Sequence, residues 1–242
     1  ALTLGGPLGM VLGLIAGIAA GGLWAFPAGW IKAYRGGHEV ITTIMLNNIA
    51  VLLARALVAG PLRDPANESP TTATLPTSSM LPPLWQSGPL KVNPALILGL
   101  VVVGVFSWWL ARTVKGYELG LVGANPTAAK AAGVRTERVS VAAMCTSGAL
   151  AGLAGSVQVL AYQGRFADGL FMNYGFDSLG VALLAGSSPW GLIPAAAMFG
   201  ALNQGSTAMT LIGVPRGITG VLLGLLIVVF AALRYRKVQT HD

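Results

Sequence analysis

Long apolar runs, separated by charged or proline-rich stretches, constrain the fold of this chain more than any other feature. The runs are about 18–25 residues long, which is the length that a helix needs to cross the hydrocarbon core of a bilayer. Hydrophobic residues make up 54% of the sequence even without its 33 glycines. In a soluble domain, hydrophobic residues and glycine together make up only about 45–50%. Because a backbone in lipid must satisfy its own hydrogen bonds, the pattern predicts an all-α, polytopic transmembrane helix bundle.

The sequence predicts about seven membrane segments within a single transmembrane domain that covers residues 1–242. Six have the length of ordinary spans: 2–26, 38–59, 94–111, 139–162, 187–209 and 217–233. The segment 173–186 is about 14 residues long, which favours a half-helix, a re-entrant segment or a strongly tilted span. Since Ala1 already lies near an apolar run with no charged leader before it, we expect further membrane segments to precede it in a longer chain.

Two of the predicted spans carry small residues at helical spacing. In span 2–26 glycine recurs every four residues, which places the glycines on one face of a helix. These glycines are Gly5, Gly9, Gly13, Gly17 and Gly21. A second set, in span 139–162, comprises Gly148, Ala151, Gly152 and Gly155. Such faces let helix backbones approach closely, so both sets predict tight helix–helix packing.

Basic residues outside the spans concentrate in three segments: 27–37, 112–138 and the C-terminal tail. These segments hold ten of the 15 Lys and Arg residues, so the positive-inside rule puts them, and the C-terminus, in the cytoplasm. The segment 60–93 holds seven prolines and no apolar period, and we expect it to be an external loop. The net charge of +7 is a topology signal here and does not indicate nucleic-acid binding.

The charged stretch 112–138 contains a short sequence with its own helix start and stop signals. Asn125 suits the N-cap position and Pro126 the first helical position. The alanines that follow favour helix, and Gly133 can end it in the left-handed conformation. We expect an exposed helix of about two turns between two spans. From the residues alone, two interpretations stay open: a docking knob for another subunit, and an ordinary capped connector.

Polar side chains inside the predicted spans are the candidates for a translocation path. Glu39, Thr43 and Asn47 are four residues apart and share one helix face. Polar groups in a membrane usually face the bundle interior or water, although interhelical hydrogen bonds would explain Thr43 and Asn47 equally well. The further candidates are Gln158, Asp177, Asn203 and Gln204. On the external side, Arg165 and Arg216 are either contacts for a partner protein or simply solvated loop charges.

The sequence contains no motif typical of catalysis, nucleotide hydrolysis or cofactor binding. It lacks a Walker lysine motif, HExxH, CxxC and a nucleophile elbow. His38 and His241 lie in no metal-ligand cluster, and the single cysteine, Cys145, excludes an internal disulfide. We therefore expect no catalytic residue, no metal site and no cofactor. If transport is active, its energy must come from another subunit.

Several motifs, spread over most of the chain, together resemble one family. They are EVITTIMLNNIA at 39–50, GPLRDP at 60–65, GYEL at 116–119, GANPTAAKAAGV at 123–134, GFDSLGVALLAG at 175–186 and SPWG at 188–191. In these motifs and their order, the chain resembles the permease subunits of bacterial ABC importers of the branched-chain amino acid and ribose type. It is most similar to permeases of nucleoside or simple-sugar uptake systems that work with binding lipoproteins of the basic-membrane-protein type.

The resemblance implies that the short helix of the central stretch is a coupling helix that docks on an ATPase subunit. This role is carried onto Asn125, Pro126, Thr127, Ala128, Ala129, Lys130 and Gly133. It also implies a second permease subunit (a copy or a paralogue), an external solute-binding protein and a place among the lipids of the bacterial inner membrane. The expected mechanism is alternating access for a nucleoside or simple sugar. The alternatives are an ion-coupled secondary transporter and a non-transporting membrane scaffold.

Overall fold

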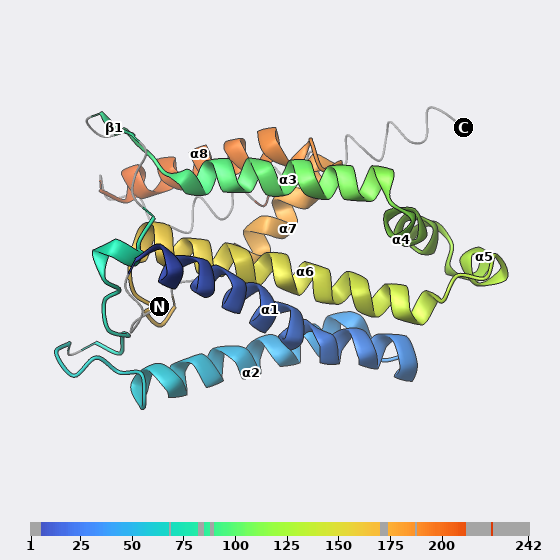
Figure 1. Cartoon of the computed structure of the whole chain (residues 1–242), viewed down its shortest axis with the longest axis horizontal. Helices are drawn as coiled ribbons and strands as arrows, with labels where there is room; N and C mark the ends of the chain where they lie inside the picture. Colours follow the sequence, from blue (N-terminus) through green and yellow to red (C-terminus); the bar gives the residue numbers. More distant parts are fainter. Residues whose placement is uncertain are drawn as a thin grey trace. The chain divides into compact units, whose positions relative to one another are not determined.

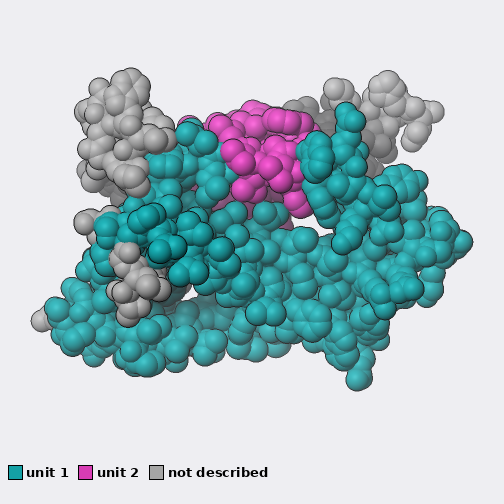
Figure 2. All heavy atoms as spheres, in the orientation of Figure 1, with its two compact units in different colours: residues 1–99, 108–170 teal, residues 100–107, 171–242 magenta. Residues whose placement is uncertain are grey.

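The computed structural model describes residues 6–67, 69–81, 85–87, 90–169, 174–186, 188–211 and Gly224, and its architecture is all-α, as predicted (Figure 1). The helices of the described residues are α1 (Pro7–Arg35), α2 (Glu39–Ala59), α3 (Pro94–Arg112), α4 (Val114–Ala124), α5 (Pro126–Ala131), α6 (Thr136–Gln158), α7 (Tyr174–Ala185) and α8 (Leu192–Leu211). The chain forms two compact units: residues 1–99 with 108–170, and residues 100–107 with 171–242 (Figure 2).

Four helices among the described residues are long and apolar enough to cross a membrane. They are α1, α2, α3 and α6, the last counted through the π-helical turn η2 (Val159–Gln163) that continues it. Each corresponds to a predicted span. The short apolar segment 173–186 forms α7, a helix of 12 residues, and α8 occupies most of span 187–209. The predicted span 217–233 lies outside the described residues except for Gly224, so the total of seven stays a prediction.

The first helix is longer than the sequence predicts. The prediction of a break after Phe26 is wrong, because α1 runs through Pro27 and ends only at Arg35. A proline inside a helix removes one backbone donor, and in a membrane helix neighbouring groups can compensate for that loss. The residues after Pro27 are compatible with helix, so the helix continues until Gly36, whose φ of 63° ends it.

Each glycine face packs tightly against a helix, as its spacing predicts, and the structure shows that the faces of α1 and α6 meet each other at Gly17 and Gly21 (Figure 1), whereas Gly5 lies outside the described residues. A Cβ atom placed on Gly21 would lie 2.2 Å from the carbonyl oxygen of Gly148, and one on Gly152 would lie 2.0 Å from that of Gly17. The assignment of Gly155 to this face is wrong, because a Cβ there would meet nothing within 4 Å. The stripe instead continues with the four-residue period to Ser156, which faces Gly17.

The predicted loop 60–93 contains no spanning helix among its described residues. It holds a single turn of 3₁₀ helix (Thr77–Ser79) and two short antiparallel strands, β1 (Trp85–Ser87) and β2 (Leu90–Val92). The strands pair Trp85 with Val92 and Ser87 with Leu90. This hairpin was not predicted, since a pair of three-residue strands gives too short an alternation to recognise in a sequence.

Candidate functional site

The helix α5 begins as its sequence predicts. The Oδ1 atom of Asn125 accepts hydrogen bonds from the backbone N–H groups of Thr127 (3.0 Å) and Ala128 (3.1 Å), so this side chain satisfies two donors that the helix itself leaves unpaired. Pro126 stands at the first helical position, where its missing N–H costs nothing. The helix start is thus fixed by the dipeptide Asn125–Pro126.

The end of α5 leads directly into α6. The helix ends at Ala131 with Ala132 as its C-cap, so Gly133 stands directly after the cap, where a left-handed glycine ends a helix as predicted. Gly133 itself has a φ of 84°, and the N–H of Val134 returns to the carbonyl of Ala129 at 3.0 Å. This closed turn brings the chain to Thr136, the first residue of α6, with little free backbone between the two helices.

Burial divides the predicted coupling residues into two groups. Asn125, Pro126, Thr127, Ala128, Lys130 and Gly133 are exposed. Ala129 is 0% exposed and packs inside its own unit. An exposed residue can contact another protein, whereas Ala129 can only hold α5 in place against the chain that carries it.

Helix α4 also belongs to this region and was not predicted from the sequence. Thr113 separates it from α3 and caps it, with its hydroxyl accepting a hydrogen bond from the N–H of Gly116 at 3.1 Å. Gly116 lies so close to the preceding helix that a Cβ would come within 2.5 Å of the carbonyl oxygen of Leu110. The threonine cap three residues before a glycine is the signal that could have revealed this turn. Together α4 and α5 form a short two-helix projection beside the beginning of α6 (Figure 1).

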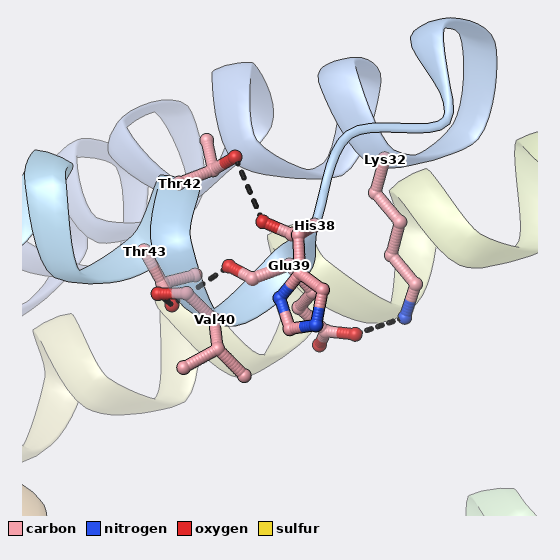
Figure 3. Close-up of polar contacts among 6 residues, drawn as sticks. All are labelled: Lys32, His38, Glu39, Val40, Thr42 and Thr43. Atoms are coloured by element: carbon pink, nitrogen blue, oxygen red, sulfur yellow. Dashed lines mark hydrogen bonds and ion pairs between the residues drawn. The ribbon is translucent and has the colours of Figure 1, made fainter.

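A cleft of about 590 Å³ opens beside this projection, within the first compact unit. Its lining residues are Lys32, Ala33, Glu39, Leu119, Val122, Gly123, Pro126, Thr136, Glu137, Val139, Ser140, Ala143 and Met144. Two ion pairs border it. Lys32 pairs with Glu39 between the end of α1 and the start of α2 (Figure 3), and Lys130 Nζ lies 3.3 Å from Glu137 Oε1, which links α5 to α6.

The predicted polar face of α2 is only partly available to a solute. Glu39 is occupied by Lys32, and the Thr43 hydroxyl donates to the carbonyls of Glu39 (3.0 Å) and Val40 (3.1 Å) of its own helix (Figure 3). Asn47 is exposed on the same face. The hydroxyl of Thr43 therefore donates within α2 and not to another helix, which differs from the interhelical hydrogen bond considered above.

In the second unit the structure brings two candidate residues together. Asn203 of α8 donates from Nδ2 to Oδ2 of Asp177 in α7 at 3.3 Å, although the two are 26 positions apart in the sequence. Gln204 is exposed on α8, next to Asn203. Gln158 lies half-buried on the last α-helical turn of α6, in the first unit.

Of the two arginines predicted to be external, Arg165 is exposed and Arg216 lies outside the described residues. A further contact was not predicted from the sequence: Arg55, near the end of α2, lies 2.9 Å from Asp168 Oδ1 through its Nε atom. Across the described part of the chain, no three His, Cys, Asp or Glu side chains come together in a way that could hold a metal ion.

The Lys32–Glu39 pair is expected to contribute little to stability. Both side chains are more than 40% exposed, and exposed ion pairs are worth about 0–1 kcal/mol. Exchanging the two residues (Lys32→Glu with Glu39→Lys) should therefore change the melting temperature in detergent by less than about 4 °C. Glu39→Gln, which removes the charge of Glu39, should also change the melting temperature by less than about 4 °C. A fall of more than about 10 °C would show that the pair holds the α1–α2 corner together.

An all-α chain with four membrane-length apolar helices is a multi-pass membrane protein. A family model, described as the permease component of the branched-chain amino acid transport system, matches residues 1–231. The chain therefore belongs to this permease family.

Individual relatives agree with that family. The guanosine ABC transporter permease protein NupP of Bacillus subtilis (strain 168) is 34% identical over 93% of this chain and 65% of its own length. The nucleoside ABC transporter permease protein NupB of Lactococcus lactis subsp. cremoris (strain MG1363) is 30% identical over 95% of this chain and 64% of its own. The glucose ABC transporter permease protein TsgB13 of Haloferax volcanii is 28% identical over 92% of this chain and 61% of its own. The chain thus spans about two thirds of the length of these relatives. No solved structure matches it.

Proposed function

We propose that this chain is the membrane-spanning permease subunit of an ATP-driven importer, and that it forms the path for a nucleoside or a simple sugar. The observation that carries the proposal is the exposed short helix α5, which lies between α4 and α6 of a permease-family chain and whose N-terminus is capped by two hydrogen bonds to Asn125. The names of the similar proteins, which refer to guanosine, nucleosides and glucose, support the solute class.

In this proposal α5 is the element on which an ATPase subunit acts. The exposed residues Asn125, Pro126, Thr127, Ala128, Lys130 and Gly133 form the docking surface. Ala129 is buried beneath that surface, and Lys130 pairs with Glu137 of α6. A short helix fixed at both ends transmits a push to the helix that follows it better than a flexible loop would. Co-purification of the ATPase subunit with the full-length permease in detergent tests this assignment, and failure to co-purify with a correctly folded permease would contradict it.

The path is assigned to the polar residues that lie within apolar helices. They are Glu39, Thr43, Asn47, Gln158, Asp177, Asn203 and Gln204. The Asp177–Asn203 pair supports this most directly, because a carboxylate and an amide side by side can accept from and donate to the hydroxyl groups of a sugar. Polar groups inside membrane segments lower the stability of the segment in lipid, so those that are present usually mark a functional site.

Changing Asp177 to leucine is expected to reduce uptake of the solute about tenfold or more, because a site that offers hydrogen bonds loses about 1–3 kcal/mol when one polar partner is left unpaired. Ser178→Ala is the matched control. Ser178 is exposed and its hydroxyl donates only to the carbonyl of Gly175 in its own helix, so its uptake should stay within about twofold. Initial uptake rates in vesicles measure both. Equal rates for the two variants would remove Asp177 from the path.

The remaining parts of the assembly follow from the same proposal. A solute-binding protein meets the external side, and the candidates to pair with its acidic residues are Arg165, which is exposed, and Arg216, which lies outside the described residues. A second permease, a copy or a paralogue, completes the path, and lipid covers the outward-facing apolar side chains. The chain lies in the bacterial inner membrane with its C-terminus in the cytoplasm, as the distribution of basic residues supports.

A further inference from the structure

The external end of α6 does not finish as an ordinary α-helix. Its last turn, η2, is π-helical, and Gly164 closes it by donating its N–H to the carbonyl of Val159 at 2.8 Å. A π turn holds one more residue than an α turn and is found mostly where surrounding groups support it, often at functional sites. The carbonyls at such an end need donors from elsewhere.

Those donors come from the proline-rich loop. We define the strap as residues 71–81. Leu81 donates its N–H to the carbonyl of Leu160 (3.0 Å), and Leu75 donates to that of Gly164 (2.7 Å). Thr72 both donates its N–H to the carbonyl of Phe166 and accepts from the N–H of Phe166 through its hydroxyl, each at 3.0 Å.

One side chain outside the strap completes this set. Asn93 donates from Nδ2 to the carbonyl of Ala161 at 2.8 Å, while its Oδ1 caps α3 by accepting from the N–H of Ala95 at 3.3 Å. Asn93 is only 8% exposed, so water cannot easily replace either bond. A single asparagine therefore joins the start of α3 to the π turn of α6.

The strap is packed against the turn as well as hydrogen-bonded to it. Thr71, Ser79 and Leu160 are each at most 6% exposed. Gly164 has a φ of 65°, and a Cβ there would come within 3.0 Å of the Met80 side chain. The left-handed backbone favours glycine at this position, whereas the flexible end of Met80 could shift to admit a Cβ.

The other end of the same helix carries α5. The segment Thr136–Gln163 is 28 residues long, which corresponds to roughly 42 Å of helix. At its beginning, Ala129 is fully buried and Lys130 pairs with Glu137. A change at η2 therefore acts on a helix that is joined directly to α5.

We propose that the strap and Asn93 form a releasable clasp that keeps the external end of α6 in its π-helical register. When the clasp opens, the carbonyl of Leu160 loses its donor in the strap and that of Ala161 loses Asn93, and the turn relaxes to α-helix. The loss of one residue from the turn rotates everything beyond it by about 100° around the helix axis. The clasp thus links an event on the external loop to the helix that carries α5. Only its transport readout rests on the proposed importer function.

The first test measures opening of the clasp without any transport. A cysteine at position 71 (Thr71→Cys, with Cys145→Ser) is buried while the strap is closed, so a membrane-impermeant maleimide reacts slowly with it. Adding Asn93→Ser should speed labelling about fivefold, because serine still caps α3 but cannot reach Ala161. The matched control is Asn48→Ser, since Asn48 is an exposed asparagine within α2, outside the loop that contains the strap. Unchanged labelling with Asn93→Ser, or equal acceleration by both variants, would overturn the clasp.

The second test locks the strap. Thr71 and Ala167 face each other as an antiparallel bridge pair, and such pairs lie about 4.5–5.5 Å apart between Cα atoms, within the range that a disulfide spans. Oxidised Thr71→Cys/Ala167→Cys in the Cys145→Ser background should lose at least about nine tenths of ATP-driven uptake, and reductant should restore it. Full uptake by the oxidised protein would overturn the proposal. If the Cys145→Ser parent also fails to transport, the importer assignment has failed, and the labelling result alone decides the clasp.

Discussion

Replacing Ala128 with glutamate is expected to reduce binding of the ATPase subunit at least about tenfold while leaving the permease folded. Ala128 is exposed on α5, and its N–H is already fixed by Asn125. A bulky charge at the centre of a docking surface must either be buried unpaired or hold the partner away. Hot-spot residues at the centre of an interface each contribute about 2 kcal/mol or more to the free energy of binding. Ala66→Glu is the matched control, because Ala66 is an exposed alanine outside the strap, in the loop assigned to the opposite side of the membrane. Binding can be measured by co-purification or by light-scattering titration in detergent.

Ala129 gives an internal check on that result. Because it is 0% exposed, Ala129→Leu should lower stability by about 1–3 kcal/mol through overpacking, and any loss of ATPase binding should follow the loss of folded protein. Ala128→Glu should instead lose binding with an unchanged melting temperature. Normal binding by a folded Ala128→Glu variant would place the docking surface elsewhere in the chain.

Gly21→Ala is expected to separate α1 from α6 and to destabilise the protein strongly. The new Cβ would lie 2.2 Å from the carbonyl oxygen of Gly148 and 2.9 Å from the Cα of Gly152. Both are backbone atoms that cannot rotate away, so the helices must move apart along their shared face. Overpacking of this kind costs about 1–3 kcal/mol, which corresponds to a fall in melting temperature of roughly 2–12 °C for a chain of this size.

Gly155→Ala provides the matched control on the same helix, α6. A Cβ at Gly155 meets nothing within 4 Å, and alanine favours helix over glycine by about 1 kcal/mol. This variant should be as stable as the parent or slightly more stable. A thermal unfolding series in detergent compares the two substitutions directly. If both lower stability equally, the close contact between α1 and α6 does not form in the membrane protein.

The features that sequence predicted well are those set by neighbouring residues. The length of an apolar run determines whether a helix can span a bilayer, so the four long helices were predictable. Asn125 and Pro126 act within one turn of their own positions, so the start of α5 could be recognised locally. The four-residue glycine period gave the faces of α1 and α6, although only the structure shows that Ser156 rather than Gly155 continues the second face.

The features that sequence could not provide depend on distant partners. Pro27 alone suggests a break, yet α1 passes through it and ends at Gly36. The pairing of Asp177 with Asn203 and that of Thr72 with Phe166 join residues 26 and 94 positions apart, and no local pattern encodes either. The burial of Ala129 also depends on the tertiary packing of α5, since alanine is compatible with an exposed or a buried place in a helix.

The most direct test of the importer assignment is solute uptake by the full-length permease, reconstituted in liposomes with its ATPase and solute-binding protein. The account predicts that labelled guanosine or another nucleoside, or glucose, accumulates only when ATP, the ATPase and the binding protein are all present, and that Ala128→Glu removes this uptake. Accumulation driven by a proton or sodium gradient in liposomes that lack the ATPase would contradict the account and identify an ion-coupled secondary transporter.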